Sequence, residues 1–365
     1  MRPQLSGPVR GVESTDDRRS TLRYRPLLAM TEPRNEAASP GLDATLHAAL
    51  GRTLQETDFP ELGTKYEGKV RDNYTTDDGR RFIVVTDRIS AFDRVLGTVP
   101  FKGQVLNRLA GWWFDKTRDV AASHMIRVPD PNVLECVECI PILVEMVVRA
   151  YVTGSTSTSI WTHYESGARV FCGHRLPDGL KKNQKLAAPI LTPTTKAPKG
   201  EHDVSGSREE IIATGKVTAA DFDAAAAIAT RLFAKGSEMC RERGLILVDT
   251  KYEFGRKKDG QIVVIDEIHT PDSSRFWMAN TYAERFAAGE DPEPLDKDFV
   301  RRHYTKMGYR GDGAAPPIPD DVRVGAAKRY IEAFERITGE AFVPDTEEPL
   351  SRIARNLGLG RKGST

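Results

Sequence analysis

The stretch from Gly244 to Trp277 constrains the fold of this chain more than any other. It begins with an apolar run, Leu245–Val248, that is typical of a buried strand. Further along, Asp259-Gly260 is a strong signal for a hairpin turn. We expect these two residues to form the turn between strands at 251–255 and 261–265. The sequence therefore predicts a buried antiparallel unit here.

Pairing that is symmetric about this turn places Glu253 directly opposite Asp266. Cβ atoms of such a pair lie about 4.5–5.5 Å apart, so the two carboxylates repel each other. A hard cation such as Mg²⁺ relieves the repulsion and usually brings substrate phosphates with it. The polar loop that follows, Thr270–Arg275, ends in an anion-binding guanidinium. The pattern predicts a metal–nucleotide site; the alternative is a surface hairpin with solvated charges.

Composition excludes several classes of protein. Of 365 residues, 39% are hydrophobic and 29% charged, which is typical of a soluble globular protein of two or three units. The formal net charge of +1 gives no overall field that favours nucleic acid or an anionic membrane. No apolar run approaches the roughly 18 residues of a membrane-spanning helix.

The chain has four cysteines, and two of them form a C-x-x-C at Cys136 and Cys139. No second pair completes a zinc site, and the surrounding residues favour a strand over a redox turn. Unpaired cysteines and the lack of a signal peptide indicate a reducing, cytoplasmic setting.

Residues 1–40 are polar and show no hydrophobic period, which predicts a disordered arm. We expect residues 1–29 to be dispensable and Met30 to be a plausible alternative start. The competing interpretation is a functional basic arm, because four arginines lie between positions 18 and 25.

A second hairpin is predicted between Gly63 and Asp87. Its strands are expected at 69–74 and 81–86, joined through Asp78-Gly79. Gly68–Asp72 stands at the beginning of the first strand. Its glycine allows close approach of the backbone to a phosphate, and Lys69 and Arg71 would project to the same side. Solvated basic residues are the alternative interpretation.

Apolar spacing predicts helices at 41–51, 104–114, 218–243 and 319–339. Residues 181–202 contain Pro189, Pro193 and Pro198, which favour a loop. An apolar strand is expected at 140–148.

A segment rich in glycine and hydroxyl groups follows the strand at 140–148. Arg149 precedes Gly154 and a run of Ser and Thr that reaches Ser159. Such groups suit an anion such as a phosphate. A plain Ser/Thr-rich turn is the alternative.

Several segments, taken in order, resemble the SAICAR synthetase family, the phosphoribosylaminoimidazole-succinocarboxamide synthases. They are GKVRDNY (68–74), TDRISAFD (86–93), KGQVLN (102–107), VVRAYVTGS (147–155), LTPTTKA (191–197), LILVDTKYEFG (245–255) and DEIHTPDSSRFW (266–277). The resemblance covers about residues 64–342.

The resemblance implies an α+β fold. An antiparallel N-terminal sheet domain would precede a larger α/β domain, with a distantly kinase-like nucleotide site between them. We expect a disordered arm at 1–40, the nucleotide-binding sheet domain at 41–148, the substrate and metal domain at 149–345 and a tail at 346–365.

The implied function is an ATP-dependent ligation in de novo purine biosynthesis. L-Aspartate would be joined to carboxyaminoimidazole ribonucleotide through an acyl phosphate, giving SAICAR, ADP and phosphate, with ATP and Mg²⁺ as cofactors. The expected partners are small molecules rather than nucleic acid or membrane, and a monomer and a homodimer both stay open.

Carried over residue by residue, the resemblance implies groups of site residues. ATP would contact Gly68, Lys69, Val70, Arg71 and Asp72, with Glu145, Met146 and Val147 lining the adenosine pocket. Glu253 and Asp266 would hold Mg²⁺. Arg149, Ser155 and Arg275 would bind the 5′-phosphate, and Lys251 and Asp272 would position the imidazole. Candidates for the aspartate side are Lys196, His202 and Asp203, although Val204–Ser207 departs from the family pattern and leaves their contacts open.

Two other functions are the alternatives to this one. A protein kinase requires H-R-D-x-x-x-x-N, and neither Arg71-Asp72 nor Arg118-Asp119 lies in that context; a small-molecule kinase with a related site is the remaining enzyme alternative. A nucleotide-sensing or nucleic-acid-binding module is the other rival, and near-zero net charge opposes nucleic acid. Release of ADP that requires both the ribonucleotide and L-aspartate separates these functions.

Overall fold

Antiparallel pairing dominates the architecture. The computed structural model describes residues 40–92, 94–196 and 203–360, and every pair of named strands within them is antiparallel. Residues 41–365 group into one compact unit, distinct from residues 1–40. Residues 1–39 of the predicted arm, with Met30, lie outside the described residues, and residue 40 begins the first helix.

A five-stranded sheet forms the N-terminal part of the compact unit, in the order β1-β2-β3-β7-β6. Its strands are β1 (Thr64–Glu67), β2 (Arg71–Thr75), β3 (Arg80–Val85), β6 (Met125–Asp130) and β7 (Val133–Val137). The predicted hairpin through Asp78-Gly79 is confirmed as β2–β3. The sheet has one strand more on its N-terminal side than the sequence predicted, because β1 pairs with β2.

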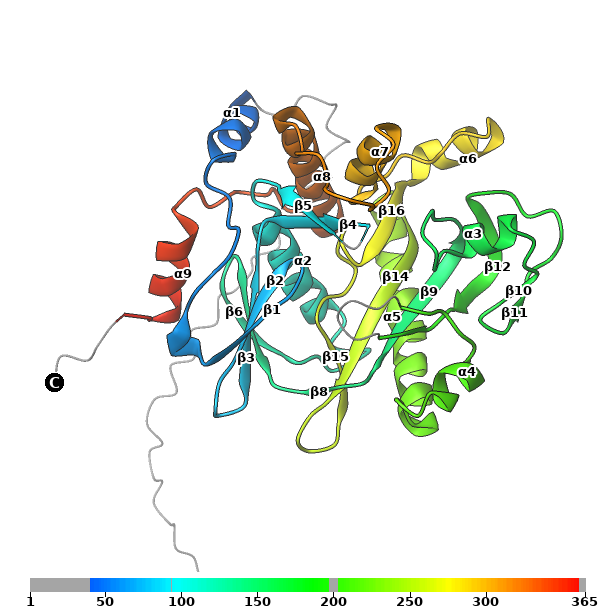
Figure 1. Ribbon diagram of the computed structural model, residues 1–365, viewed down its shortest axis with the longest axis horizontal. Coiled ribbons are helices and arrows are strands. Elements are labelled where there is room, and N and C mark those ends of the chain that lie inside the picture. Colours follow the sequence, from blue (N-terminus) through cyan, green and yellow to red (C-terminus); the bar gives the residue numbers. More distant parts are fainter. Residues whose placement is uncertain (1–39, 93, 197–202, 361–365) are drawn as a thin grey trace, which may run out of the picture. The chain divides into compact units, whose positions relative to one another are not determined.

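A seven-stranded sheet is centred on β14 (Leu245–Arg256), the long strand in the middle of Figure 1. This strand pairs with β9, β15, β16 and β8, while β12 and β13 pair with β9. The partners are β8 (Ile140–Pro141), β9 (Val144–Val152), β12 (Gln184–Leu191), β13 (Thr194–Thr195), β15 (Ile262–Ile265) and β16 (Ser274–Met278). The prediction of a loop throughout 181–202 is therefore wrong for β12 and β13.

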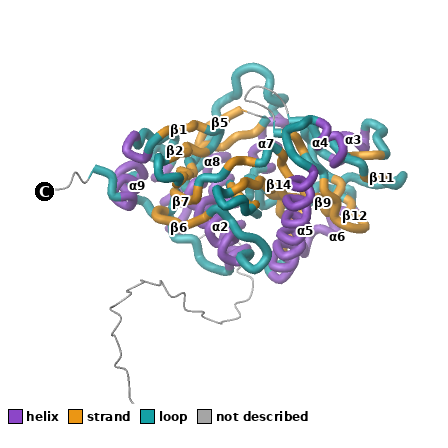
Figure 2. Tube along the Cα trace, turned by 90° about the horizontal axis from the view of Figure 1, so that it is seen from below, coloured by secondary structure: helices purple, strands orange, loops and turns teal. Residues whose placement is uncertain are grey.

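Two helices lie on the same side of the sheets, α2 (Lys102–Lys116) and α5 (Ala219–Glu242) (Figure 2). The predicted start of α5 is confirmed, because the Thr218 side chain accepts a hydrogen bond from the Asp221 backbone N–H. The remaining elements are α1 (Pro40–Ala49), η1 (Pro60–Leu62), β4 (Arg88–Ala91), β5 (Arg94–Thr98), α3 (Ile160–Glu165), β10 (Val170–Phe171), β11 (His174–Arg175), α4 (Arg208–Ala213), α6 (Ala279–Ala287), α7 (Asp298–Lys306), α8 (Asp320–Thr338) and α9 (Pro349–Leu357).

One hydrophobic core links the two sheets through α2, α5 and α8. Leu109 and Trp113 of α2, Leu232 of α5 and Ile331 of α8 are buried in the same cluster as Val148 of β9. This continuity holds the strand ends of both sheets in a fixed relation, which matters for the site they carry.

A smaller core lies around Tyr74, Phe82 and Val133 of the five-stranded sheet, and the segment predicted as a tail contributes to it. Within 346–365, Pro349–Leu357 forms α9, and its Ile353 is fully buried. This helix was not predicted, because its apolar face is only a few residues wide.

The hairpin β14–β15 differs from its predicted register by one residue. Glu253 pairs with Ile265, not with Asp266. The connection is longer than two residues: the Lys257 N–H donates to the Gln261 carbonyl at 2.9 Å, and the Gly260 N–H donates to the Lys257 carbonyl at 2.9 Å. Asp266 therefore lies beyond the end of β15, in left-handed backbone with φ 67°.

The four cysteines are unpaired thiols, as expected, and Cys136 and Cys139 are buried in or next to β7. Among the described residues no group of three or more His, Cys, Asp and Glu has the arrangement of a metal centre. No helix in the same residues is long and apolar enough to cross a membrane.

Candidate active site

A tight turn joins β1 to β2 at Gly68–Val70. The Gly68 N–H donates to the Arg71 carbonyl at 2.8 Å, and a Cβ at Gly68 would lie 3.1 Å from that same oxygen. Lys69 is exposed in this turn rather than on the strand. The prediction that Lys69 and Arg71 share one side of a strand is therefore wrong, because β2 begins only at Arg71.

Arg88 fixes the β1–β2 turn through hydrogen bonds to its backbone. Its guanidinium donates to the carbonyls of Lys69 and Gly68, each at 3.0 Å, and to the Asp72 carboxylate at 2.8 Å. Asp72 is fully buried and also accepts from the Thr57 N–H at 2.7 Å. Of the residues predicted to contact ATP, Asp72 is thus held inside the protein, where it fixes Arg88. Arg88 was not among the predicted site residues, although the segment TDRISAFD (86–93) contains it.

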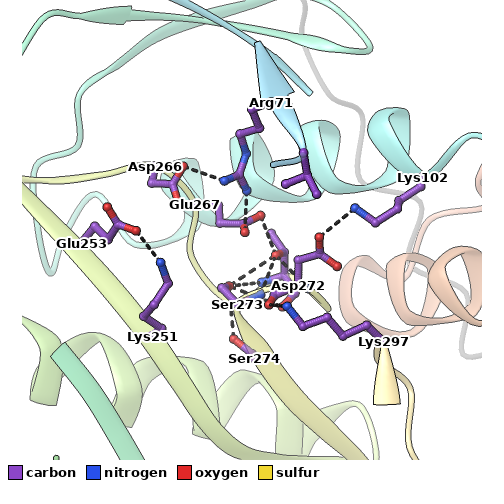
Figure 3. A network of polar contacts seen from close by, with 12 residues as sticks. Arg71, Lys102, Lys251, Glu253, Asp266, Glu267, Asp272, Ser273, Ser274 and Lys297 are labelled. Atoms are coloured by element: carbon purple, nitrogen blue, oxygen red, sulfur yellow. Dashed lines mark hydrogen bonds and ion pairs between the residues drawn. The ribbon is translucent and has the colours of Figure 1, made fainter. Parts of the chain in front are cut away.

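Arg71 reaches from β2 to the segment that links β15 to β16. We call residues 266–273 the carboxylate loop. Arg71 pairs with Asp266 at 2.8 Å and with Glu267 through its second amino group (Figure 3). The Thr270 hydroxyl donates to Glu267 at 2.7 Å. Glu267, which is buried and was not singled out from the sequence, links the two sheets together with Asp266.

Lysines neutralise the predicted metal ligand Glu253. Lys251 and Lys196 both donate to its carboxylate, and Lys251 also donates to Glu145 at 3.0 Å. Burial opposes ionisation of Glu253, but the two ammonium groups hold its pKa well below its usual range. Burial raises the pKa of Asp266, and the charge of Glu253 raises it further.

These two carboxylates fit a divalent ion such as Mg²⁺. Their oxygens are hard donors, and Glu253 and Asp266 are close enough for one charge to act on the other. Cationic side chains of Lys196, Lys251 and Arg71 balance them. The assignment of Mg²⁺ to these two residues stays a prediction, and the strand pairing that first suggested it is shifted by one residue.

Asp272 is anchored by groups from three helical regions. Its carboxylate accepts from Lys102 at 2.7 Å, and its carbonyl accepts from Lys297 at 2.7 Å (Figure 3). The carboxylate also accepts from the Tyr330 hydroxyl at 2.6 Å. Burial lowers the pKa of Lys297 to about 8. None of these three partners was named from the sequence, because each lies far from Asp272 along the chain.

The residues predicted to bind the 5′-phosphate converge beside β9 and β14. Arg149 pairs with Asp249 at 3.1 Å, and Arg275 donates to the same carboxylate oxygen. A Cβ at Gly154, where φ is 103°, would lie 3.1 Å from the Arg275 guanidinium. Ser155 follows this glycine and is exposed. Two guanidinium groups share the Asp249 carboxylate, and the charges of Asp296 and Asp298 also act on Arg275. Guanidinium groups are suited to binding an anion such as a phosphate.

The remaining candidates lie near Glu145 on β9. Register places Met146 opposite Tyr252 and Val147 opposite Lys251, and Met146 is fully buried. Asp203 is exposed, and its charge contributes to the raised pKa of Glu145, which burial dominates. His202 lies outside the described residues.

Known proteins match this chain over all of the candidate site residues. A family model described as SAICAR synthetase matches residues 64–317. The chain is 52% identical over 308 residues to phosphoribosylaminoimidazole-succinocarboxamide synthase of Legionella pneumophila (strain Lens), covering 83% of this chain and 97% of that protein. It is 47% identical over 319 residues to the enzyme named phosphoribosylaminoimidazole-succinocarboxamide synthase, chloroplastic, of Arabidopsis thaliana, covering 86% of this chain and 77% of that protein.

Solved structures agree with the sequence relatives. SAICAR-synthase from Saccharomyces cerevisiae complexed with SAICAR aligns with a TM-score of 0.67 and 30% identity, over 80% of this chain and 100% of that chain. A SAICAR synthetase in complex with ADP aligns with a TM-score of 0.60 and 26% identity, over 77% of this chain and 100% of that chain. These likenesses confirm the predicted α+β fold. Because the family model spans every candidate residue from Gly68 to Arg275, this chain belongs to the SAICAR synthetase family, the ligases of purine biosynthesis.

Proposed function

We propose that this chain joins L-aspartate to the carboxylate of carboxyaminoimidazole ribonucleotide, with ATP converted to ADP and phosphate. The observation that carries the proposal is the pairing of Arg71 with Asp266 and Glu267. It brings a turn suited to phosphates against a loop that leads directly to Arg275. The names of the solved neighbours, which mention ADP and SAICAR, support the same two halves of a site.

The chemistry explains why such a site needs charge and geometry. A carboxylate is a poor acylating agent, because its oxygen is a poor leaving group. Attack of that oxygen on the γ-phosphorus of ATP expels ADP and forms an acyl phosphate. The aspartate amine then attacks the carbonyl carbon, phosphate leaves, and the amine loses a proton to give the amide. Both steps require mainly positioning and neutralisation of phosphate charge.

ATP is assigned to the β1–β2 turn. In this proposal the backbone of Gly68–Val70 covers the phosphates, and Lys69 and Arg71 contact them. Arg88 and the buried Asp72 hold the turn in shape through the hydrogen bonds described above. Glu145 to Val147 line the adenosine side.

Glu253 and Asp266 are assigned to Mg²⁺. When bound, the ion would neutralise part of the phosphate charge. Lys196 and Lys251 already balance Glu253 in the structure. They would therefore keep this carboxylate ionised and ready to coordinate.

The ribonucleotide is assigned to the cluster around Asp249. Arg149, Arg275 and Ser155 would bind its 5′-phosphate, while Lys251 and Asp272 would orient the imidazole. Lys196, His202 and Asp203 stay the candidates for the aspartate side. A cytoplasmic location, and assembly as a monomer or a homodimer, stay predictions.

Measurement of ADP release tests the proposed function. Purified protein with ATP and Mg²⁺ is expected to release ADP only when both the ribonucleotide and L-aspartate are present, with SAICAR identified by mass; L-asparagine is the matched control. A small-molecule kinase would release ADP with the ribonucleotide alone, and a nucleotide sensor would bind ATP without turnover. Either result would end the proposal.

A further inference from the structure

The carboxylate loop contains two non-glycine residues in a left-handed backbone conformation, which the surrounding contacts must stabilise. Asp266 has φ 67° and His269 has φ 51°, so two non-glycine residues in this short segment are left-handed. Such residues are costly and persist where neighbouring structure fixes them. Between and beside them lie Glu267, which pairs with Arg71, and Thr270, which donates to Glu267.

The His269 side chain fills a socket built by three elements. Its ring packs edge to face on Trp113 of α2, with centroids 4.6 Å apart, and on Tyr252 of β14, with centroids 5.4 Å apart. The third wall is Gly236 of α5, where a Cβ would lie only 2.3 Å from Cε1 of the imidazole. Glycine is therefore required at 236 for the ring to enter.

The socket holds a neutral imidazole that is closed to solvent. His269 is 0% exposed, and its Nε2 forms a hydrogen bond with the Tyr252 hydroxyl. Burial lowers the pKa of His269 to about 3, so the ring is uncharged under ordinary conditions. A buried, uncharged ring cannot touch substrate or carry a catalytic proton. What it can do is fix its own backbone, three residues from Asp266.

We propose that His269 is a positioning residue: its ring, locked between Trp113, Gly236 and Tyr252, holds the carboxylate loop so that Asp266 and Glu267 face Arg71 and the metal. The inference rests on the function proposed above and adds a residue to it. The contacts of the His269 ring are with α2, α5 and β14, whereas Asp266 pairs with Arg71 of β2.

Two substitutions disturb the packing of the His269 ring in different ways. His269→Ala removes the ring, and Gly236→Ala inserts a methyl group where the ring lies. Each is expected to weaken binding of Mn²⁺, a spectroscopic substitute for Mg²⁺, by about 10- to 100-fold, as loss of a group that orients a metal ligand does. Electron paramagnetic resonance measures the free ion, and circular dichroism at the same temperature verifies that the protein is folded.

Two further variants separate positioning from core packing. Gly325→Ala makes the same change in α8, where the Cβ would meet the Phe299 ring at 3.2 Å, and is expected to leave Mn²⁺ affinity unchanged. The double variant Gly236→Ala/His269→Ala removes the clash, so its melting temperature should recover relative to Gly236→Ala alone. Its Mn²⁺ affinity should stay weak, because the anchor is still missing.

Unchanged Mn²⁺ affinity in folded His269→Ala and Gly236→Ala, within about twofold of the wild type, would overturn the role of His269 while leaving the proposed function intact. Recovery of affinity in the double variant would also overturn it. Wild-type protein that binds no Mn²⁺ would contradict the proposed metal site itself, and this inference with it.

Discussion

Charged residues of the candidate site form ion pairs with residues from distant parts of the chain. Arg71 pairs with Asp266, Lys102 with Asp272, and both Arg149 and Arg275 with Asp249. Removing one partner of such a buried pair leaves the other charge buried without a counter-ion. The resulting loss of stability is larger than the stability that the intact pair contributes. Substitutions here should therefore be read with a measurement of folding beside each kinetic constant.

Sequence reasoning found many of these residues but few of the pairs. Motif resemblance and residue chemistry named Arg71, Asp266 and Asp272. They did not identify Lys102 or Glu267 as partners, although both lie in quoted segments. The reason is physical: Lys102 and Asp272 are 170 positions apart, and only the packing of α2 against the loop brings them together.

Asp266→Asn tests the metal assignment. We expect turnover to fall by about 10²-fold or more, the scale for losing a preorganised charged group, because the change removes the charge of a proposed Mg²⁺ ligand and of its ion pair with Arg71. Steady-state ADP release over a range of Mg²⁺ concentrations measures it, with a thermal melt for folding. Asp259→Asn, the same change in the exposed β14–β15 connection, is the control. Near wild-type activity of Asp266→Asn at low Mg²⁺ would remove Asp266 from this role.

Arg275→Ala tests the phosphate assignment. The KM for the ribonucleotide should rise by an amount equivalent to about 1.5–3 kcal/mol, the cost of losing a charge-assisted hydrogen bond, while the KM for ATP stays nearly constant. Initial rates with each substrate varied in turn separate the two. Arg285→Ala, on α6, provides a matched arginine variant that pairs with Glu290 instead. Equal effects of Arg275→Ala on both substrates would contradict the assignment.

At the scale of elements, hairpins and long helices were predictable, whereas register and the C-terminal helix were not. The Asp259-Gly260 signal located the β14–β15 hairpin, but a longer connection moved the pairing by one residue. That single step changes which side chains are opposite each other, since side chains alternate along a strand. The α9 helix escaped prediction because a fully buried arginine, rather than a broad apolar face, anchors it.

Arg352→Met tests the contribution of α9 to the five-stranded sheet. Arg352 pairs with Asp130 at 3.1 Å and also donates to Asn132. All three residues are buried. Loss of the guanidinium leaves Asp130 buried without its main partner, so unfolding free energy should fall by about 3–5 kcal/mol. Urea denaturation followed by tryptophan fluorescence measures the change.

The control for this substitution is Arg355→Met, three positions along the same helix. Arg355 pairs with Glu347 on the surface, where solvent screens the interaction, so the urea midpoint should stay within error of the wild type. An equally small change for Arg352→Met would mean that α9 does not stabilise the sheet.

At the scale of the whole molecule, the parts of the site lie on two sheets joined by one core. The predicted boundary between residues 148 and 149 lies inside β9, so a continuous strand passes from one predicted domain to the next. The β1–β2 turn belongs to the five-stranded sheet, and Glu253 and Arg275 belong to the seven-stranded one. In the proposed function, ATP would therefore be bound mainly by the five-stranded sheet and the ribonucleotide by the seven-stranded one.

The central claim is that the ribonucleotide carboxylate is phosphorylated before it is joined to L-aspartate. Transfer of oxygen tests this most directly. With both oxygens of that carboxylate labelled as ¹⁸O, the mechanism sends one labelled oxygen into the released phosphate and leaves the other in the new amide. Mass spectrometry of the phosphate and of SAICAR from the same reaction should therefore find one ¹⁸O in each. Phosphate released without ¹⁸O, while labelled SAICAR accumulates, would contradict the acyl phosphate and with it this account of the site.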